Sequence, residues 1–153
     1  MIHALFTEKY RPKNLEDLIL PERVMSKFKD GLSQNMLLAG SPGTGKTSYI
    51  RYLIASLKKK IIFLPPNMAG AITSPNLISI LIENPNSIFV IEDAENIVVD
   101  RERDGDSPVS ALLNISDGLL ADCLNVQIIC SFNIDISKID SALIRKGRLI
   151  AKY

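Results

Sequence analysis

The sequence predicts an α/β fold in which a five-stranded parallel sheet is covered by helices on both faces. Five short apolar runs predict the strands, at residues 35–39, 61–64, 87–91, 126–131 and 149–153. Segments of helical composition separate most of these runs, and continuously apolar strands that alternate with helices are typical of a buried parallel sheet. A glycine-rich segment directly follows the first strand. Since ligands of such sheets bind at the carboxyl ends of the strands, the fold class also predicts where a ligand would bind.

All 153 residues are interpreted as one domain. Residues 1–20 are predicted to be an extended lead-in segment, because Pro12 forces extended backbone on the residue before it. Residues 21–153 form the predicted α/β core, which is large enough to bury about two-thirds of its unfolded surface. A helix is predicted at residues 21–29, since it opens with a proline, a residue favoured at the first helical position.

The segment at residues 40–47 reads GSPGTGKT and matches the pattern G-x-x-x-x-G-K-[ST]. Its glycines would let backbone N–H groups wrap a triphosphate, and the helix predicted at residues 47–57 would turn its positive dipole end to the phosphates. Lys46 would reach the β- and γ-phosphates, and the Thr47 hydroxyl a magnesium ion. The pattern therefore predicts a three-layer P-loop NTPase sandwich that binds ATP and Mg²⁺. The predicted nucleotide contacts here are Gly40, Ser41, Pro42, Gly43, Thr44, Gly45, Lys46, Thr47 and Ser48.

The rest of the chain predicts helices and loops between the later strands. Residues 67–74 are small and predict a flexible segment. A helix is predicted at residues 75–83, with Leu77, Ile80 and Leu81 facing inward. The further predictions are an exposed charged loop at residues 100–106, a helix at 108–115 that stops at Asp117 and Gly118, and a helical turn at 141–144.

Two carboxylates, Glu92 and Asp93, follow the third apolar run. Nucleotidases with this loop place a magnesium-binding acid at such a strand end, beside an acid that orients the attacking water. In one register Glu92 serves the metal and Asp93 the water, although the commoner order is Asp then Glu. In the other register Asp93 serves the metal and Glu95 the water. We prefer the first, because the apolar run ends at Glu92.

Taken together, these residues resemble an AAA+ ATPase from about Glu8 to the end of the chain. Residues 112–118 are similar to the L-L-N-x-x-D-G segment of AAA proteins. Asn133 matches the sensor-1 position, which in that family places the attacking water near the γ-phosphate. Residues 139–148 are similar to the family's D-P-A-L-x-R-x-G-R box. The resemblance implies that Arg145 and Arg148 are trans-acting arginine fingers for the neighbouring subunit.

Two branches of the family share this resemblance. The order Glu92-Asp93 and the segments LLNISDGL and ALIRKGR are most like the mitochondrial Rieske-protein translocase branch of AAA proteins. The segment EKYRPKNLEDLILP looks like the start of clamp-loader small subunits, although their Ser-Arg-Cys motif is absent. The second resemblance implies that the adenine is flanked by Tyr10, Arg11, Ile19 and Leu20.

Two departures from the family pattern stand out. Residues 67–74 lack the aromatic-apolar-glycine triplet with which many ring translocases grip a polypeptide, which argues against threading of an unfolded chain. The chain stops at Tyr153, just after the arginine box and before the family's helical lid, so we interpret it either as a fragment of a longer protein or as a minimal module. Without the lid, the adenine side is expected to be more exposed.

Composition excludes little beyond this. A net charge of +1 gives no reason to expect nucleic acid, although a local basic face remains compatible with it. Cys123 and Cys130 lack metal-ligand spacing and are predicted to be buried thiols in a reducing compartment. No signal peptide or membrane-spanning run is present, so we expect a soluble cytoplasmic protein without a membrane segment.

The leading hypothesis is an ATP-hydrolysing AAA+ core that acts in a homo-oligomeric ring, such as a hexamer, and remodels a protein or a protein–nucleic-acid assembly. The alternative is an ATP-gated assembly subunit, similar to a clamp loader, with weak or no hydrolysis. The inverted acidic pair and the missing lid would suit the alternative. A small-molecule kinase would share the phosphate loop, but it leaves Asn133 and the arginine box unexplained.

Overall fold

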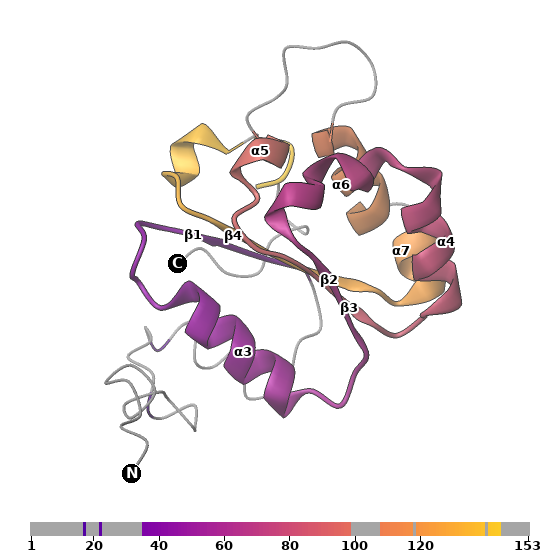
Figure 1. Cartoon of the computed structure of the whole chain (residues 1–153), viewed down its shortest axis with the longest axis horizontal. Helices are drawn as coiled ribbons and strands as arrows, with labels where there is room; N and C mark the ends of the chain where they lie inside the picture. The colour runs from indigo at the N-terminus through magenta and orange to yellow at the C-terminus, as the bar shows by residue number, and fades with distance from the viewer. Residues whose placement is uncertain are drawn as a thin grey trace.

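The computed structural model describes residues 17, 22, 35–98, 108–117, 119–139 and 141–144 (Figure 1). Within these ranges, four parallel strands form one sheet in the order β1-β4-β3-β2. The strands are β1 Met36–Ala39, β2 Ile61–Leu64, β3 Ile88–Ile91 and β4 Gln127–Phe132. All four match strands predicted from the sequence to within a residue or so at each end, whereas the fifth, at residues 149–153, lies outside the described residues.

Helices cover both faces of this sheet, as predicted. Helix α3 (Lys46–Ser56) packs on one face, and α4 (Pro75–Glu83), α6 (Pro108–Asp117) and α7 (Leu119–Leu124) lie on the other (Figure 1). The core is accordingly divided into two clusters. Met36, Leu38 and Val90 pack with α3, while their strand neighbours Leu37 and Phe89 join the larger cluster on the other face. Because successive strand side chains point to opposite faces, the continuously apolar strands fill both layers.

Three short helical segments connect these elements. Helix α5 (Glu95–Val98) follows β3, the 3₁₀ helix η2 (Pro66–Thr73) precedes α4, and the 3₁₀ turn η3 (Ile136–Lys138) follows β4. The sequence did not predict α5 or α7, because helices of four and six residues are too short for a 3.6-residue period to emerge. The flexible segment predicted at residues 67–74 is wrong: it is 3₁₀-helical, and its Ile72 is buried in the larger cluster.

Two predictions about side-chain burial are also wrong. In α4, Leu77 and Leu81 are buried, but Ile80 is 43% exposed. Around the helix, Ile80 and Leu81 lie on opposite sides of Leu77. The buried face of α4 includes Leu77 and Leu81 and is too narrow to include Ile80 as well. Cys130 is buried as predicted, and burial raises the pKa of its thiol. Cys123, on α7, is exposed.

The predicted helix at residues 21–29 lies outside the described residues except for Glu22, which is helical. The charged loop at 100–106 also lies outside them. The turn predicted at residues 141–144 is present, with the Ile144 N–H donating to the Ser141 carbonyl (3.3 Å). No helix among the described residues is both long and apolar enough to cross a membrane.

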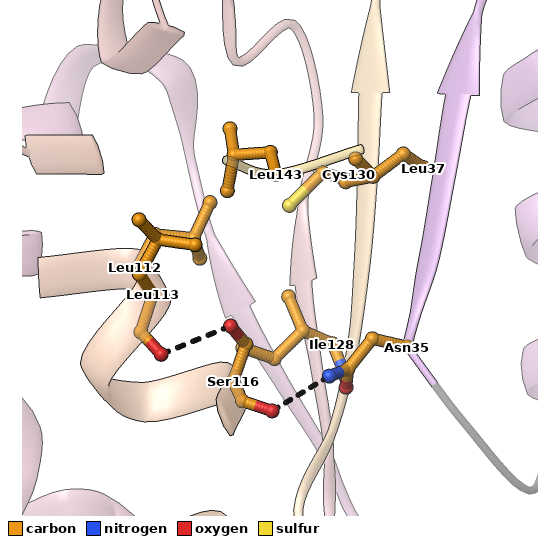
Figure 2. Close-up of a pocket in the computed structure, with 8 residues that line it drawn as sticks. All are labelled: Asn35, Leu37, Leu112, Leu113, Ser116, Ile128, Cys130 and Leu143. Carbon is orange, nitrogen blue, oxygen red and sulfur yellow. Dashed lines mark hydrogen bonds between the residues drawn. The ribbon is translucent and has the colours of Figure 1, made fainter. Parts of the chain in front are cut away.

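One polar side chain joins α6 to the sheet. The Asn35 amide donates to the Ser116 carbonyl at the end of α6 (2.9 Å), and its Oδ1 accepts from the Ile128 N–H of β4 (2.9 Å). Asn35 and Ser116 also line a cavity of about 20 Å³ (Figure 2). Its other lining residues are Leu37, Leu112, Leu113, Ile128, Cys130 and Leu143. Asn35 thus satisfies backbone hydrogen-bonding groups of α6 and β4, which are not consecutive in the chain.

Replacing Asn35 with alanine should therefore destabilise the fold. The change leaves a backbone donor and a backbone acceptor without this partner, and each such loss typically costs about 1–3 kcal/mol when the group is buried. Urea unfolding followed by circular dichroism measures the effect. Asn114→Ala, at an exposed position of α6, is the matched control and should stay within about 0.5 kcal/mol of the unaltered protein. Equal unfolding midpoints for the two variants would contradict this role of Asn35.

Candidate active site

The phosphate loop lies between the carboxyl end of β1 and the first turn of α3, where the sequence predicts it. Gly43 and Gly45 have φ angles of 82° and 84°, in the left-handed region that favours glycine. No atom lies within 4 Å of a Cβ built on either residue, so within this chain the backbone conformation is what requires glycine there. Gly45 is the N-cap of α3 and supplies no side-chain cap, which leaves amides of the first turn available to an anion.

Lys46, the first residue of α3, points back into this loop. Its ammonium donates to the carbonyls of Gly40 and Ser41 (2.8 Å each) and lies 3.3 Å from the Thr44 hydroxyl. The side chain is only 8% exposed. A buried lysine ammonium inside the phosphate loop favours an anionic ligand, because water screens its charge less than at the surface.

The opposite wall of the site comes from the segments that follow β3 and β4. Asp93 has a φ of 50°, a left-handed conformation that Asp and Asn tolerate better than most residues. Its Oδ1 accepts a hydrogen bond from the Asn133 side-chain amide (2.7 Å). Ser131, on β4, accepts the Asp93 N–H through its hydroxyl (3.3 Å) and the Ala94 N–H through its carbonyl (2.9 Å). The two predicted water-positioning residues are therefore in direct contact, although they are 40 positions apart.

These walls enclose a cavity of about 270 Å³. It is open to solvent and polar, as a site for a charged, solvated ligand should be. The phosphate loop and the pair Asp93–Asn133 both line it, so the structure brings together residues that the sequence predicted separately. The lining residues are Gly43, Gly45, Lys46, Thr47, Ser48, Asp93, Ser131 and Asn133.

Ser131 was not among the predicted site residues. It is almost fully buried at the end of β4, and its side chain faces the cavity and the Asp93 amide. The signal that could have found it is a hydroxyl at the carboxyl end of an otherwise apolar strand. In a parallel sheet, that position is beside the end of the neighbouring strand and hence beside Asp93.

Glu92 does not line the cavity, but its position fits a cation. Its Oε1 is buried, and no hydrogen-bond donor in the described part of the chain contacts it. An orphaned carboxylate oxygen is costly, and a hard cation or its water would satisfy it. Thr47 brings a hydroxyl to the cavity. Among the described residues no three acidic, His or Cys side chains cluster, and Mg²⁺ needs only one or two carboxylates besides water and phosphate oxygens.

The other predicted site residues lie outside the described residues. These are the arginines Arg145 and Arg148 and the adenine-flanking residues Tyr10, Arg11, Ile19 and Leu20. Their roles stay predictions from the family resemblance.

A parallel α/β sheet with a glycine-rich phosphate loop between β1 and α3, and polar residues on the neighbouring strand ends, defines a P-loop nucleotide-binding protein. Within that class, residues 36–153 match the model of the ATPase family associated with various cellular activities (AAA). The chain belongs to the AAA family, which confirms the resemblance seen in the sequence.

Known relatives agree with this assignment. An AAA-ATPase of Arabidopsis thaliana is 36% identical over 142 residues, which cover 84% of this chain and 28% of the relative. The probable mitochondrial chaperone bcs1 of Schizosaccharomyces pombe is 32% identical over 124 residues, covering 76% of this chain and 27% of that protein. A replication factor C small subunit of Aeropyrum pernix is 38% identical over 52 residues, covering 31% of this chain and 16% of the relative. The chain thus spans less than a third of the length of each of these proteins.

Among solved structures, the Thermotoga maritima RuvB Holliday junction branch migration motor superposes with a TM-score of 0.63 at 20% identity. The alignment covers 92% of this chain and 48% of that chain. At this identity the likeness shows the fold, and it agrees with the P-loop NTPase sandwich that the sequence predicts.

Proposed function

We propose that this chain is the catalytic core of a magnesium-dependent ATPase, which converts ATP and water to ADP and phosphate. The observation that carries the proposal is the shared cavity, in which the phosphate loop faces the hydrogen-bonded pair Asp93–Asn133. A site for binding alone needs the loop and Lys46. It has no need for a carboxylate and an amide on the facing wall, where water could attack the terminal phosphate.

The reaction is in-line attack of water on the γ-phosphate, which depends on positioning and charge stabilisation and needs little covalent chemistry from the protein. Lys46 and the loop amides would stabilise charge on the phosphate oxygens. Asp93 would accept a hydrogen bond from the water and polarise it. Asn133 donates to Oδ1 of Asp93, and Oδ2 would be the oxygen that contacts the water.

Thr47 and Glu92 are the residues that would hold Mg²⁺, the hydroxyl directly and the carboxylate directly or through water. The ion would neutralise negative charge on the phosphate oxygens. The buried, unpaired Oε1 of Glu92 supports this part of the proposal.

The proposal extends to assembly. Family membership and the names of the relatives, a chaperone and a branch migration motor among them, support a homo-oligomeric ring, such as a hexamer, that remodels a macromolecular assembly. Arg145 and Arg148 would complete the site of a neighbouring subunit.

The rival function is an ATP-gated assembly subunit with little hydrolysis, which the similarity to a replication factor C small subunit favours. Multiple-turnover phosphate release separates the two, because an oligomer that binds ATP but releases no phosphate above background supports the rival.

Lys46→Ala should weaken ATP binding at least about tenfold, since a charge-assisted phosphate contact makes up a large part of a micromolar affinity. Titration with a fluorescent ATP analogue measures it. The control is Lys58→Ala, which removes an exposed lysine beyond the end of α3 and should leave the affinity unchanged. Equal affinities for Lys46→Ala and the unaltered protein would contradict the assignment of the phosphate loop.

A further inference from the structure

Asn133 is held in the site by two carboxylates. Its side-chain amide donates to Asp93, and its backbone N–H donates to Oε1 of Glu95. Asn133 directly follows β4 and lies beyond the last paired residue of that strand. These two contacts hold the backbone and the side chain of Asn133 from the same neighbouring segment.

Glu95 is well placed to set this geometry. It is the first residue of α5 and lies two residues after Asp93. Hydrogen bonds place the segments 93–95 and 131–133 beside each other. The N–H groups of Asp93 and Ala94 donate to Ser131, and Asn133 donates back to Asp93 and Glu95. Four hydrogen bonds that run in both directions tie the two segments together.

Glu95 lies outside the lining of the candidate nucleotide cavity. Asp93 and Asn133 line the cavity of about 270 Å³, whereas Glu95 does not, and its side chain is half-buried. Its Oε1 accepts the backbone N–H of Asn133. The contact that links Glu95 to the cavity is the one with Asn133.

We propose that Glu95 is a positioning residue: by accepting the backbone N–H of Asn133 it orients the Asn133 amide toward Asp93, and so fixes the carboxylate that polarises water. This inference rests on the proposed ATPase function. It also distinguishes the two assignments of the acidic residues that the sequence leaves open. In the alternative assignment Glu95 itself orients the attacking water, whereas here it acts on Asn133.

Three variants test the role by kinetics. Glu95→Gln keeps an oxygen that can accept the amide and should retain at least about a third of kcat. Glu95→Ala removes it and should lower kcat about 10- to 100-fold with KM within about twofold, since small misplacements of a catalytic group cost rate more than binding. Glu83→Ala, at the exposed end of α4, is the matched control and should behave as the unaltered protein. If Glu95→Gln is as inactive as Glu95→Ala, the charge of Glu95 takes part in the chemistry and the positioning role is wrong.

A double-mutant cycle shows whether Glu95 acts through Asn133. Once Asn133→Ala has removed the side chain, Glu95→Ala should reduce kcat less than about threefold further, because residues in one network are not additive. Fully multiplicative losses would overturn the inference.

A measurement on the folded protein keeps the test independent of activity. The Asn133 amide proton should resonate downfield in the unaltered protein and move upfield in Glu95→Gln, since a hydrogen bond to a carboxylate is stronger than one to a neutral amide. An unchanged resonance would show that the contact is absent. If the unaltered protein releases no phosphate but the resonance shifts, the proposed function fails while the contact between Glu95 and Asn133 stands.

Discussion

Asp93→Asn should leave ATP binding within a few-fold of the unaltered protein and lower turnover by about 10² to 10⁴, the usual contribution of a general base. The substitution is nearly isosteric, and asparagine tolerates the left-handed φ of 50° at this position. Its side-chain oxygen can still accept the Asn133 amide that now contacts Oδ1. The loss therefore reports the charge that polarises water, with little change in local structure.

Phosphate release under multiple turnover measures the rate, and a fluorescent ATP analogue measures the binding. Asp122→Asn, an exposed carboxylate on α7, is the matched control and should change neither. Normal turnover by Asp93→Asn would remove Asp93 from the chemistry and leave the pair Asp93–Asn133 as a structural contact.

The elements that the sequence predicts well are those whose signal is local. The four described strands are continuous apolar runs, and the phosphate loop is a contiguous pattern with a lysine and glycines at fixed positions. Helix α4 was predicted with its bounds because Pro75 begins it and Asn84 follows it. Ile80 was misplaced because the sequence shows an apolar helix but not how wide a stripe the sheet will cover.

The contacts that complete the site could not be predicted in the same way. Asp93 is predicted from its place at a strand end and Asn133 from the family resemblance, but the hydrogen bond between them depends on β3 and β4 being neighbours in the sheet. The acceptor role of Glu95 depends further on a four-residue helix that has no sequence signal of its own. The pairing of β3 with β4 thus brings residues that are predicted separately into one site.

The proposed arginine fingers, Arg145 and Arg148, predict the second large effect, which is that activity should depend on assembly. An arginine finger is typically worth about 10³ to 10⁵ in rate. Specific activity should therefore rise with protein concentration, and the double variant Arg145→Ala, Arg148→Ala should be nearly inactive while it still binds ATP. Arg51→Ala, an exposed arginine on α3, is the control and should keep full activity.

The described residues just before Arg145 are packed against the core of the domain. Ile139 and Leu143 are buried in the larger core cluster, and Leu143 lines the small cavity beside Leu112 (Figure 2). The turn at residues 141–144, which leads directly to Arg145, is thus anchored to the domain. If the following arginines act on a neighbour's nucleotide as proposed, an anchored turn would limit the entropy lost when they bind it.

Mixing two inactive proteins tests whether the arginines act in trans. The double arginine variant keeps an intact phosphate loop, and Lys46→Ala keeps intact arginines, so each protein alone should release phosphate at background rate. Mixed oligomers contain interfaces in which a working loop meets working arginines, and activity should therefore reappear under conditions that allow subunit exchange. Analytical ultracentrifugation of labelled subunits establishes that mixed oligomers form. If they form and stay inactive, or if the double arginine variant hydrolyses ATP normally as a monomer, the arginines do not act on a neighbouring site.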